Sequence, residues 1–182
     1  GGLGSIMGSF FGAAFIVILP IAINLVLPVM GSLVGVQVST AALTHAEQII
    51  FGALNDQSIA WKVAQRAHEE GATFVLTNAP IAMRMGEINA LAAETGSQVI
   101  PADATSIEDL TNLVTQAQEI LGGKIDFVLH SIGMSPNVRK GKHYTENDYN
   151  YYNQSMDVSA ISLHKTLATL YKQDAMNEWG SV

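Results

Sequence analysis

The residues Ile49-Ile50-Phe51-Gly52-Ala53-Leu54-Asn55-Asp56-Gln57-Ser58-Ile59-Ala60-Trp61 combine a short apolar run, a glycine, a polar turn and the start of a helix. This pattern predicts a strand, a phosphate-binding loop and a helix. Unpaired N–H groups at a helix N-terminus, together with the helix dipole, bind a pyrophosphate without a dedicated cation. Gly52 allows the sharp turn, and the Ser58 hydroxyl is placed to reach a phosphate oxygen. Ordinary strand-to-helix turns show the same spacing, so both interpretations stay open.

The composition limits the classes of protein to which the chain can belong. Its 182 residues, 48% of them apolar, are enough for one domain with a sizeable core. The net charge of −7 disfavours a nucleic-acid partner, which requires a basic surface. The absence of cysteine excludes disulfides, thiolate chemistry and cysteine zinc sites. We therefore expect a cytoplasmic protein.

The distribution of charge divides the chain into two pieces. Residues 1–46 contain no Asp, Glu, Lys or Arg, whereas charge appears at ordinary density from Glu47 onward. We place the boundary between an apolar piece, residues 1–48, and a globular piece, residues 49–182.

Residues 10–30 predict a helical segment of membrane type. These 21 residues have one strongly polar side chain, Asn24, and about 20 apolar residues suffice to span a bilayer. Pro20 and Pro28 each remove a backbone donor, which favours a broken or re-entrant hairpin over a simple spanning helix. A buried core helix is the alternative. A secretory signal peptide would need positive charge in residues 1–9, which carry none.

The small-residue spacing of residues 1–15, Gly-Gly-Leu-Gly-Ser-Ile-Met-Gly-Ser-Phe-Phe-Gly-Ala-Ala-Phe, followed by Leu19-Pro20, resembles a late segment of branched-chain amino-acid ABC transporter permeases. The resemblance covers residues 1–48, and a complete permease has several further spans. It implies an alternative function, in which the chain is a membrane permease component.

From residue 49 onward, strand and helix patterns alternate at the spacing of βαβ units. Apolar runs predict strands at residues 49–51, 73–76, 98–101 and 125–130. Helical patterns occupy residues 58–70, 86–94, 107–121 and 146–177, and residues 180–182 resemble the start of a fifth strand. The first helix is predicted to bury Ile59, Val63, Ala64 and Ala67. We predict an α/β fold, a doubly wound parallel sheet of Rossmann type, truncated after the fourth strand and its following helix.

The carboxyl ends of these strands define the predicted ligand site, because a doubly wound sheet binds its ligand at the switch point there. The residues that follow the four strands are Gly52, Thr77-Asn78, Asp103-Ala104 and Ser131-Ile132-Gly133. We predict that Asp103 accepts from an adenine amino group and that Gly133 leaves room for the nicotinamide ribose. Alternatively, Asp103 caps the next helix and His130 is a core imidazole. Thr77-Asn78-Ala79 has neither the acidic residue that marks NAD nor the Arg that marks NADP.

The turn Gly52-x5-Ser58-Ile59-Ala60, the position of Asp103 and the run His130-Ser131-Ile132-Gly133-Met134-Ser135-Pro136 occur in order. With them, residues 49–182 resemble the enoyl-acyl-carrier-protein reductases of fatty-acid synthesis, a divergent family of short-chain dehydrogenases/reductases. The resemblance implies NADH as cofactor, without excluding NADPH, an acyl-carrier-protein thioester as substrate, and a homo-tetramer. It implies that Ser135 borders the acyl substrate and that the cofactor contacts Gly52, Ser58, Ile59, Asp103, Ala104, Ser131, Ile132 and Gly133.

The catalytic pair of that family is missing from the sequence. The family uses a Tyr to stabilise the enolate oxygen and a Lys, seven residues later, to hold the nicotinamide ribose. None of the five tyrosines, at 144, 149, 151, 152 and 171, is followed by Lys four or seven positions later. We therefore assign no catalytic residue and no metal ligand, and we expect this chain alone to be inactive.

The two pieces meet without a linker at residues 49–54. A reductase anchored to a membrane would need its first strand to begin within a few residues of a bilayer segment. An accidental join of two genes is the favoured explanation, with a genuine anchored reductase as the alternative.

Overall fold

The computed structural model describes residues 46–85, 87–136, 143 and 145–182. The predicted membrane contact at residues 10–30 and nearly all of the permease-like piece lie outside the described residues. Within the described ranges, no helix combines the length and the apolar character that crossing a bilayer requires.

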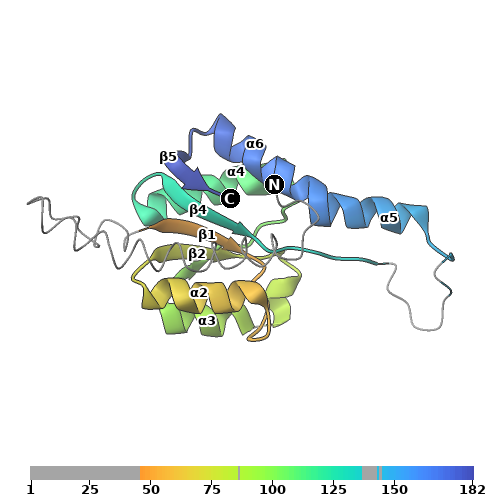
Figure 1. The fold of residues 1–182 in the computed structure, drawn as a ribbon, viewed down its shortest axis with the longest axis horizontal. Coiled ribbons are helices and arrows are strands. Elements are labelled where there is room, and N and C mark those ends of the chain that lie inside the picture. Colours follow the sequence, from red (N-terminus) through yellow and green to blue (C-terminus); the bar gives the residue numbers. More distant parts are fainter. Residues whose placement is uncertain (1–45, 86, 137–142, 144) are drawn as a thin grey trace, which may run out of the picture. The chain divides into compact units, whose positions relative to one another are not determined.

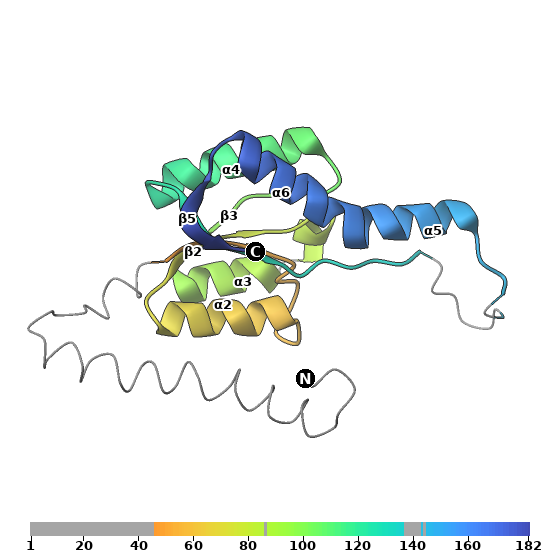
Figure 2. The same ribbon diagram turned by 45° about the horizontal axis from the view of Figure 1, so that its top comes forward.

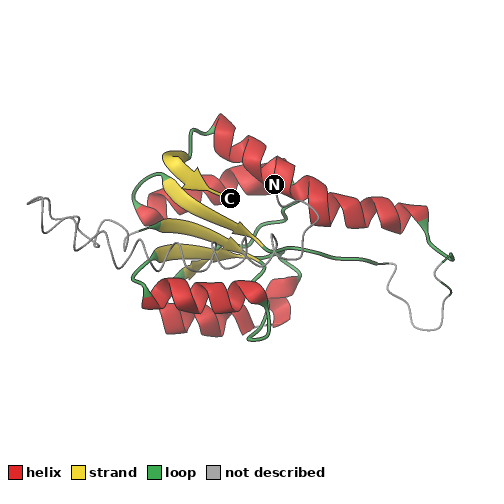
Figure 3. Ribbon diagram, viewed as in Figure 1, coloured by secondary structure: helices red, strands yellow, loops and turns green. Residues whose placement is uncertain are grey.

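Five parallel strands form one sheet in the order β3-β2-β1-β4-β5 (Figures 1 and 3). They are β1 (Glu47–Phe51), β2 (Thr73–Thr77), β3 (Gln98–Val99), β4 (Ile125–His130) and β5 (Met176–Ser181). The chain starts in the middle at β1, moves outward to β3, and then crosses back to β4 and β5. The switch point therefore lies between β1 and β4, and the predicted doubly wound sheet is confirmed.

Helices cover both faces of the sheet. The helices α2 (Ile59–Glu69) and α3 (Glu87–Thr95), with a short 3-10 turn η2 (Ala82–Met85) before α3, lie on one face, and α4 (Ile107–Leu121) and α6 (Ser162–Lys172) lie on the other (Figures 1 and 2). Alternate residues of β1 separate two cores: Ile50 packs with α2 and α3, whereas Ile49 and Phe51 pack with α4 and α6. All three are at most 1% exposed, as a parallel strand covered on both faces requires.

The buried face of α2 is only partly the predicted one: Ala64 and Ala67 pack in the core as predicted, and Ile59 does not. Ala60, Trp61 and Ala64 are buried, whereas Ile59 is 74% exposed. Successive residues are about 100° apart around a helix, so Trp61 shares a face with Ala64 and Ile59 does not. The prediction that Ile59 packs in the core was therefore wrong.

The C-terminal region also departs from prediction. The single helix predicted at residues 146–177 is instead α5 (Tyr149–Met156), a π-helical turn η3 (Asp157–Ile161) and α6, followed by β5. Asp174 adopts a φ of 48°, a left-handed conformation that ends the helical segment, so Asn177 lies in β5. The fifth strand thus runs from Met176 to Ser181, whereas only its start, at residues 180–182, was predicted.

Asp126 joins three strands at the amino edge of the sheet. Its Oδ2 accepts from the Glu47 N–H in β1 at 3.0 Å, and its Oδ1 accepts from the Asn177 side chain in β5 at 2.6 Å. Burial raises the pKa of Asp126, but these hydrogen bonds outweigh it, so the pKa lies below its usual value. β1 begins at Glu47, two residues earlier than predicted, where it pairs with Thr73 of β2, and Asp126 adds side-chain links from β4 to β1 and β5.

Candidate cofactor site

Gly52 follows β1 and meets the residue that follows β4. A Cβ on Gly52 would lie 2.0 Å from the carbonyl oxygen of Ser131, and the φ of Gly52 is +87°, in the left-handed region. Only glycine therefore fits there. The Gly52 N–H also donates to the Thr77 carbonyl at 3.2 Å, which ties the turn to the end of β2. The structure thus brings Gly52 and Ser131 together at the switch point.

The N-terminus of α2 is open toward the same edge. Ser58 is the N-cap residue, but its hydroxyl donates to the Asn55 carbonyl at 2.7 Å and caps no helix N–H, and no acidic residue lies in the first turn. In α4, by contrast, the Ser106 hydroxyl accepts from the Asp109 N–H at 3.2 Å, and Glu108 and Asp109 add negative charge. Of these two helix starts, α2 is therefore the one suited to an anion.

Asp103 organises the loop between β3 and α4. Its Oδ1 accepts from the N–H and the hydroxyl of Thr105, both at 2.8 Å, and its own N–H donates to Asp109 Oδ2 at 2.9 Å. One carboxylate oxygen therefore shapes the turn that leads into α4, and Oδ2 has no partner among the described residues. Ala104 is 6% exposed and packs in the core, so its side chain is not available to a ligand.

The loop after β4 presents backbone and small side chains. Ile132 is partly buried against the core below it, while Gly133, Met134 and Ser135 are exposed. A Cβ on Gly133 would have its nearest neighbour, the Ser159 hydroxyl, at 3.9 Å, so there is free space above this loop. Gly52, Ser58, Ile59 and the loop after β4 thus lie on one edge of the sheet, as predicted from parallel strands.

His130 ends β4 and is held by a side chain. Its Nε2 lies 2.9 Å from the hydroxyl of Ser162, which donates its proton to the Val158 carbonyl at 2.7 Å. The Ser162 oxygen therefore accepts from Nε2–H. Burial lowers the pKa of His130, with a smaller opposing effect of a backbone hydrogen bond, so the ring is neutral at pH 7. His130 is half-buried and belongs to neither core, so the prediction of a core imidazole was wrong, and the partner of its ring is the Ser162 side chain.

Two residues that contact these loops were not predicted. The Ser159 hydroxyl accepts from the Met134 N–H at 3.1 Å, and Lys165 Nζ donates to the Thr105 carbonyl at 2.8 Å. The partners are 25 and 60 residues apart along the chain, so no local sequence pattern signals them.

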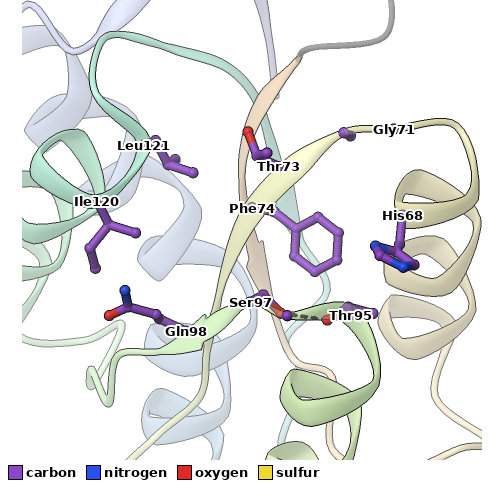
Figure 4. A pocket seen from close by; sticks show the side chains of 11 residues that line it. His68, Gly71, Thr73, Phe74, Thr95, Ser97, Gln98, Ile120 and Leu121 are labelled. Atoms are coloured by element: carbon purple, nitrogen blue, oxygen red, sulfur yellow. Dashed lines mark hydrogen bonds between the residues drawn. The ribbon is translucent and has the colours of Figure 1, made fainter.

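A cavity of about 500 Å³ lies at the opposite edge of the sheet. Its lining combines the ends of α2, α3 and α4 with the first residues of β2 and β3, and a hydrogen bond of 2.6 Å joins Thr95 and Ser97 within it (Figure 4). Helix C-termini direct carbonyl oxygens and a partial negative charge toward this edge, which disfavours an anionic ligand. We therefore place the cofactor site at the carboxyl edge.

A parallel sheet in the order 3-2-1-4-5, with an open helix N-terminus at its switch point, defines a Rossmann domain, the class in which dinucleotides bind at this edge. The family model described as enoyl-(acyl carrier protein) reductase matches residues 52–182. The chain belongs to this family.

Individual relatives agree. The NADH-dependent enoyl-acyl-carrier-protein reductase FabI of Rickettsia bellii is 32% identical over 79% of this chain, and the NADH-dependent enoyl-acyl-carrier-protein reductase 1 of Rhizobium meliloti is 32% identical over 74%. The crystal structure of the FabI–NADH complex from Alistipes finegoldii is 57% identical, with a TM-score of 0.73 over 76% of this chain. The chain spans about half of each relative, at 54%, 48% and 49% of their lengths.

Proposed function

We propose that the protein containing this sequence is an NADH-dependent enoyl-acyl-carrier-protein reductase that reduces the trans-2 double bond of enoyl thioesters in fatty-acid synthesis. The chain supplies the cofactor-binding part. The observation that carries this proposal is the contact of Gly52 with Ser131 beside the open N-terminus of α2. The NADH complex of the Alistipes finegoldii relative supports the choice of cofactor.

Three loops would each bind a different part of the cofactor. The backbone of Gly52, Ser58 and Ile59 holds the pyrophosphate, because N–H groups at the start of α2 are free of a side-chain cap. Asp103 and Ala104 lie beside adenine, with the Asp103 Oδ2 as acceptor for the amino group. The backbone of Ser131, Ile132 and Gly133 adjoins the nicotinamide ribose, and Ser135 borders the acyl substrate.

Besides a hydride, the reduction needs groups that protonate and stabilise the enolate, and these residues lie outside the cofactor loops. Nicotinamide provides the hydride when bound, and the enolate that forms needs an acid and a charge partner. The chain contains no Tyr with Lys four or seven positions later. We therefore propose that it binds NADH without reducing an enoyl thioester.

We propose that the whole protein associates with copies of itself through the helical segment α5–α6. Large apolar side chains recur there at spacings of three, four or seven residues without cover from the described residues. They are Tyr149, Tyr152, Met156, Leu163, Leu167 and Tyr171, which are 37–88% exposed. Such spacing forms the ridges by which helices pack on one another, so a second copy of the same helix is the occupant.

The role of residues 1–48 is a separate question. The family model begins at residue 52, so the predicted permease-like piece lies outside it. We propose that residues 1–48 and residues 49–182 are distinct units, that the reductase part acts in the cytoplasm, and that its thioester partner is the acyl-carrier protein.

Titration of the full chain with NADH tests the proposal. Calorimetry is expected to show saturable binding of one NADH per chain and competition by ADP-ribose. In the presence of a short enoyl-acyl-carrier-protein, absorbance at 340 nm should stay constant. Failure to bind NADH would contradict the cofactor site, and consumption of NADH would contradict the absence of catalysis.

A further inference from the structure

The π-helical turn η3 holds the loop after β4 by one side chain. Ser159, in the middle of this turn, accepts from the Met134 N–H at 3.1 Å and donates to the Met134 carbonyl at 3.3 Å. One hydroxyl thus bonds to both backbone polar groups of Met134, the residue that follows Gly133. A π turn is a rare irregularity, common at functional sites, and here it directs Ser159 toward the site described above.

The same turn is linked to the loop after β3 through Lys165 of α6. Asp157, the first residue of η3, accepts from Lys165 Nζ at 2.8 Å, and the same Nζ donates to the Thr105 carbonyl at 2.8 Å. The Lys165 side chain is only 24% exposed. Thr105 in turn holds the Asp103 carboxylate through its N–H and its hydroxyl. A continuous set of hydrogen bonds therefore runs from the π turn to Asp103.

The two loops lie far apart on the sheet. β3 and β4 are separated by β2 and β1, that is, by three strand spacings or roughly 14 Å. In a doubly wound fold, each half of the sheet binds one mononucleotide, so the loop after β3 serves the adenosine half and the loop after β4 the nicotinamide half. The π turn bonds directly to the loop after β4 through Ser159, and it reaches the loop after β3 through Asp157 and Lys165, which lies in α6.

We propose that η3 and Lys165 form a positioning device that sets the separation of the two cofactor loops. Lys165, held by Asp157, positions the adenosine loop through Thr105, and Ser159 positions the nicotinamide loop through Met134. These residues act on the cofactor through the backbone of the loops, so they are positioning residues. The inference rests on the proposed binding of NADH.

The proposal predicts that substitutions in η3 and at Lys165 change the affinities for NADH and ADP-ribose by different factors. Calorimetry on the full chain compares NADH with ADP-ribose, which lacks only the nicotinamide ring. Lys165→Met should weaken both ligands by about fivefold, whereas Ser159→Ala should weaken NADH by about threefold and ADP-ribose by less, because ADP-ribose keeps the ribose beside this loop but lacks the ring. Lys165→Arg should restore most of the affinity. Lys172→Met, an exposed lysine on the same helix, is the matched control and should change neither ligand.

Asp157→Asn keeps the side-chain size and provides a second variant if Lys165→Met does not fold. It should weaken NADH and ADP-ribose by about twofold each, because Lys165 loses its charge partner. Wild-type affinity for NADH and ADP-ribose in all of these variants, or equal weakening of the two ligands by Ser159→Ala, would overturn the positioning proposal alone. Absence of NADH binding by the unmodified chain would overturn the proposed function and this inference with it.

Discussion

Gly52 is the residue of the candidate cofactor site at which adding a single carbon atom should have the largest effect. A methyl group there would collide with the Ser131 carbonyl at 2.0 Å and would need a φ of +87°. Gly52→Ala should therefore shift the two strand ends apart, weaken NADH binding by tenfold or more and lower stability by about 1–3 kcal/mol. Calorimetry and urea unfolding measure the two effects.

Gly123→Ala is the matched control, because no atom lies within 4 Å of the added Cβ and Gly123 has no left-handed φ. It should bind NADH as the unmodified chain does. If Gly52→Ala bound NADH as tightly as this control, the assignment of the glycine turn to the pyrophosphate would be wrong.

His130 makes stability depend on pH. Its folded-state pKa lies below the ordinary value of 6.5, chiefly because of burial. As the pH falls below about 6.5, His130 becomes protonated in the unfolded chain but stays neutral in the folded chain. The free energy of unfolding therefore decreases. Urea unfolding at about pH 7.5 and pH 5.5 should show this loss, and His130→Gln, which keeps a donor for Ser162, should lose less. An equal loss in both proteins would contradict the role of His130.

The sequence could predict the position of candidate site residues that local backbone determines. Gly52, Ser58 and Gly133 occupy turns that strand ends and helix starts impose, and they lie where expected. It could not predict Ser159 or Lys165, because their contacts depend on a π turn that changes the direction of side chains in the middle of a helix. It also did not predict that the Ser58 hydroxyl bonds to Asn55.

At the level of elements, α4 is the helix whose bounds and cap the sequence predicts most accurately. Its predicted bounds, Ile107–Leu121, and its cap, Ser106, are confirmed, since both helix ends carry strong local signals. Gly122 ends α4 with a φ of 80°. The segment after α6 lacks such signals: its left-handed residue is Asp174, and β5 is an exposed edge strand without alternating apolar residues. The prediction that the helix continues to residue 177 was therefore wrong.

Ser106 tests the coupling of α4 to the adenosine loop. Ser106→Ala removes the cap hydrogen bond to the Asp109 N–H, and Asp109 also accepts from the Asp103 N–H. The substitution should cost about 1 kcal/mol of stability and weaken ADP-ribose about twofold. Thr115→Ala, on an exposed turn of the same helix, is the control and should change the affinity for neither NADH nor ADP-ribose. Unchanged stability in Ser106→Ala would show that the cap is not formed.

At the scale of the whole molecule, the exposed apolar side chains of α5 and α6 predict self-association. Light scattering after gel filtration should show a species larger than a monomer. Leu163→Glu combined with Leu167→Glu should shift it to monomer, because burying two carboxylates in a helix interface is costly. Lys172→Glu serves as the control. A monomeric unmodified chain would contradict the interface.

The central claim is that NADH binds at the carboxyl edge of the sheet, across the switch point. Hydrogen–deuterium exchange of the full chain with and without NADH tests it most directly, because it locates the ligand along the backbone. We expect slower exchange in residues 52–61, 103–106 and 131–135, and no change around the cavity lined by His68, Phe74 and Gln98 (Figure 4). Slower exchange confined to that cavity would contradict this account.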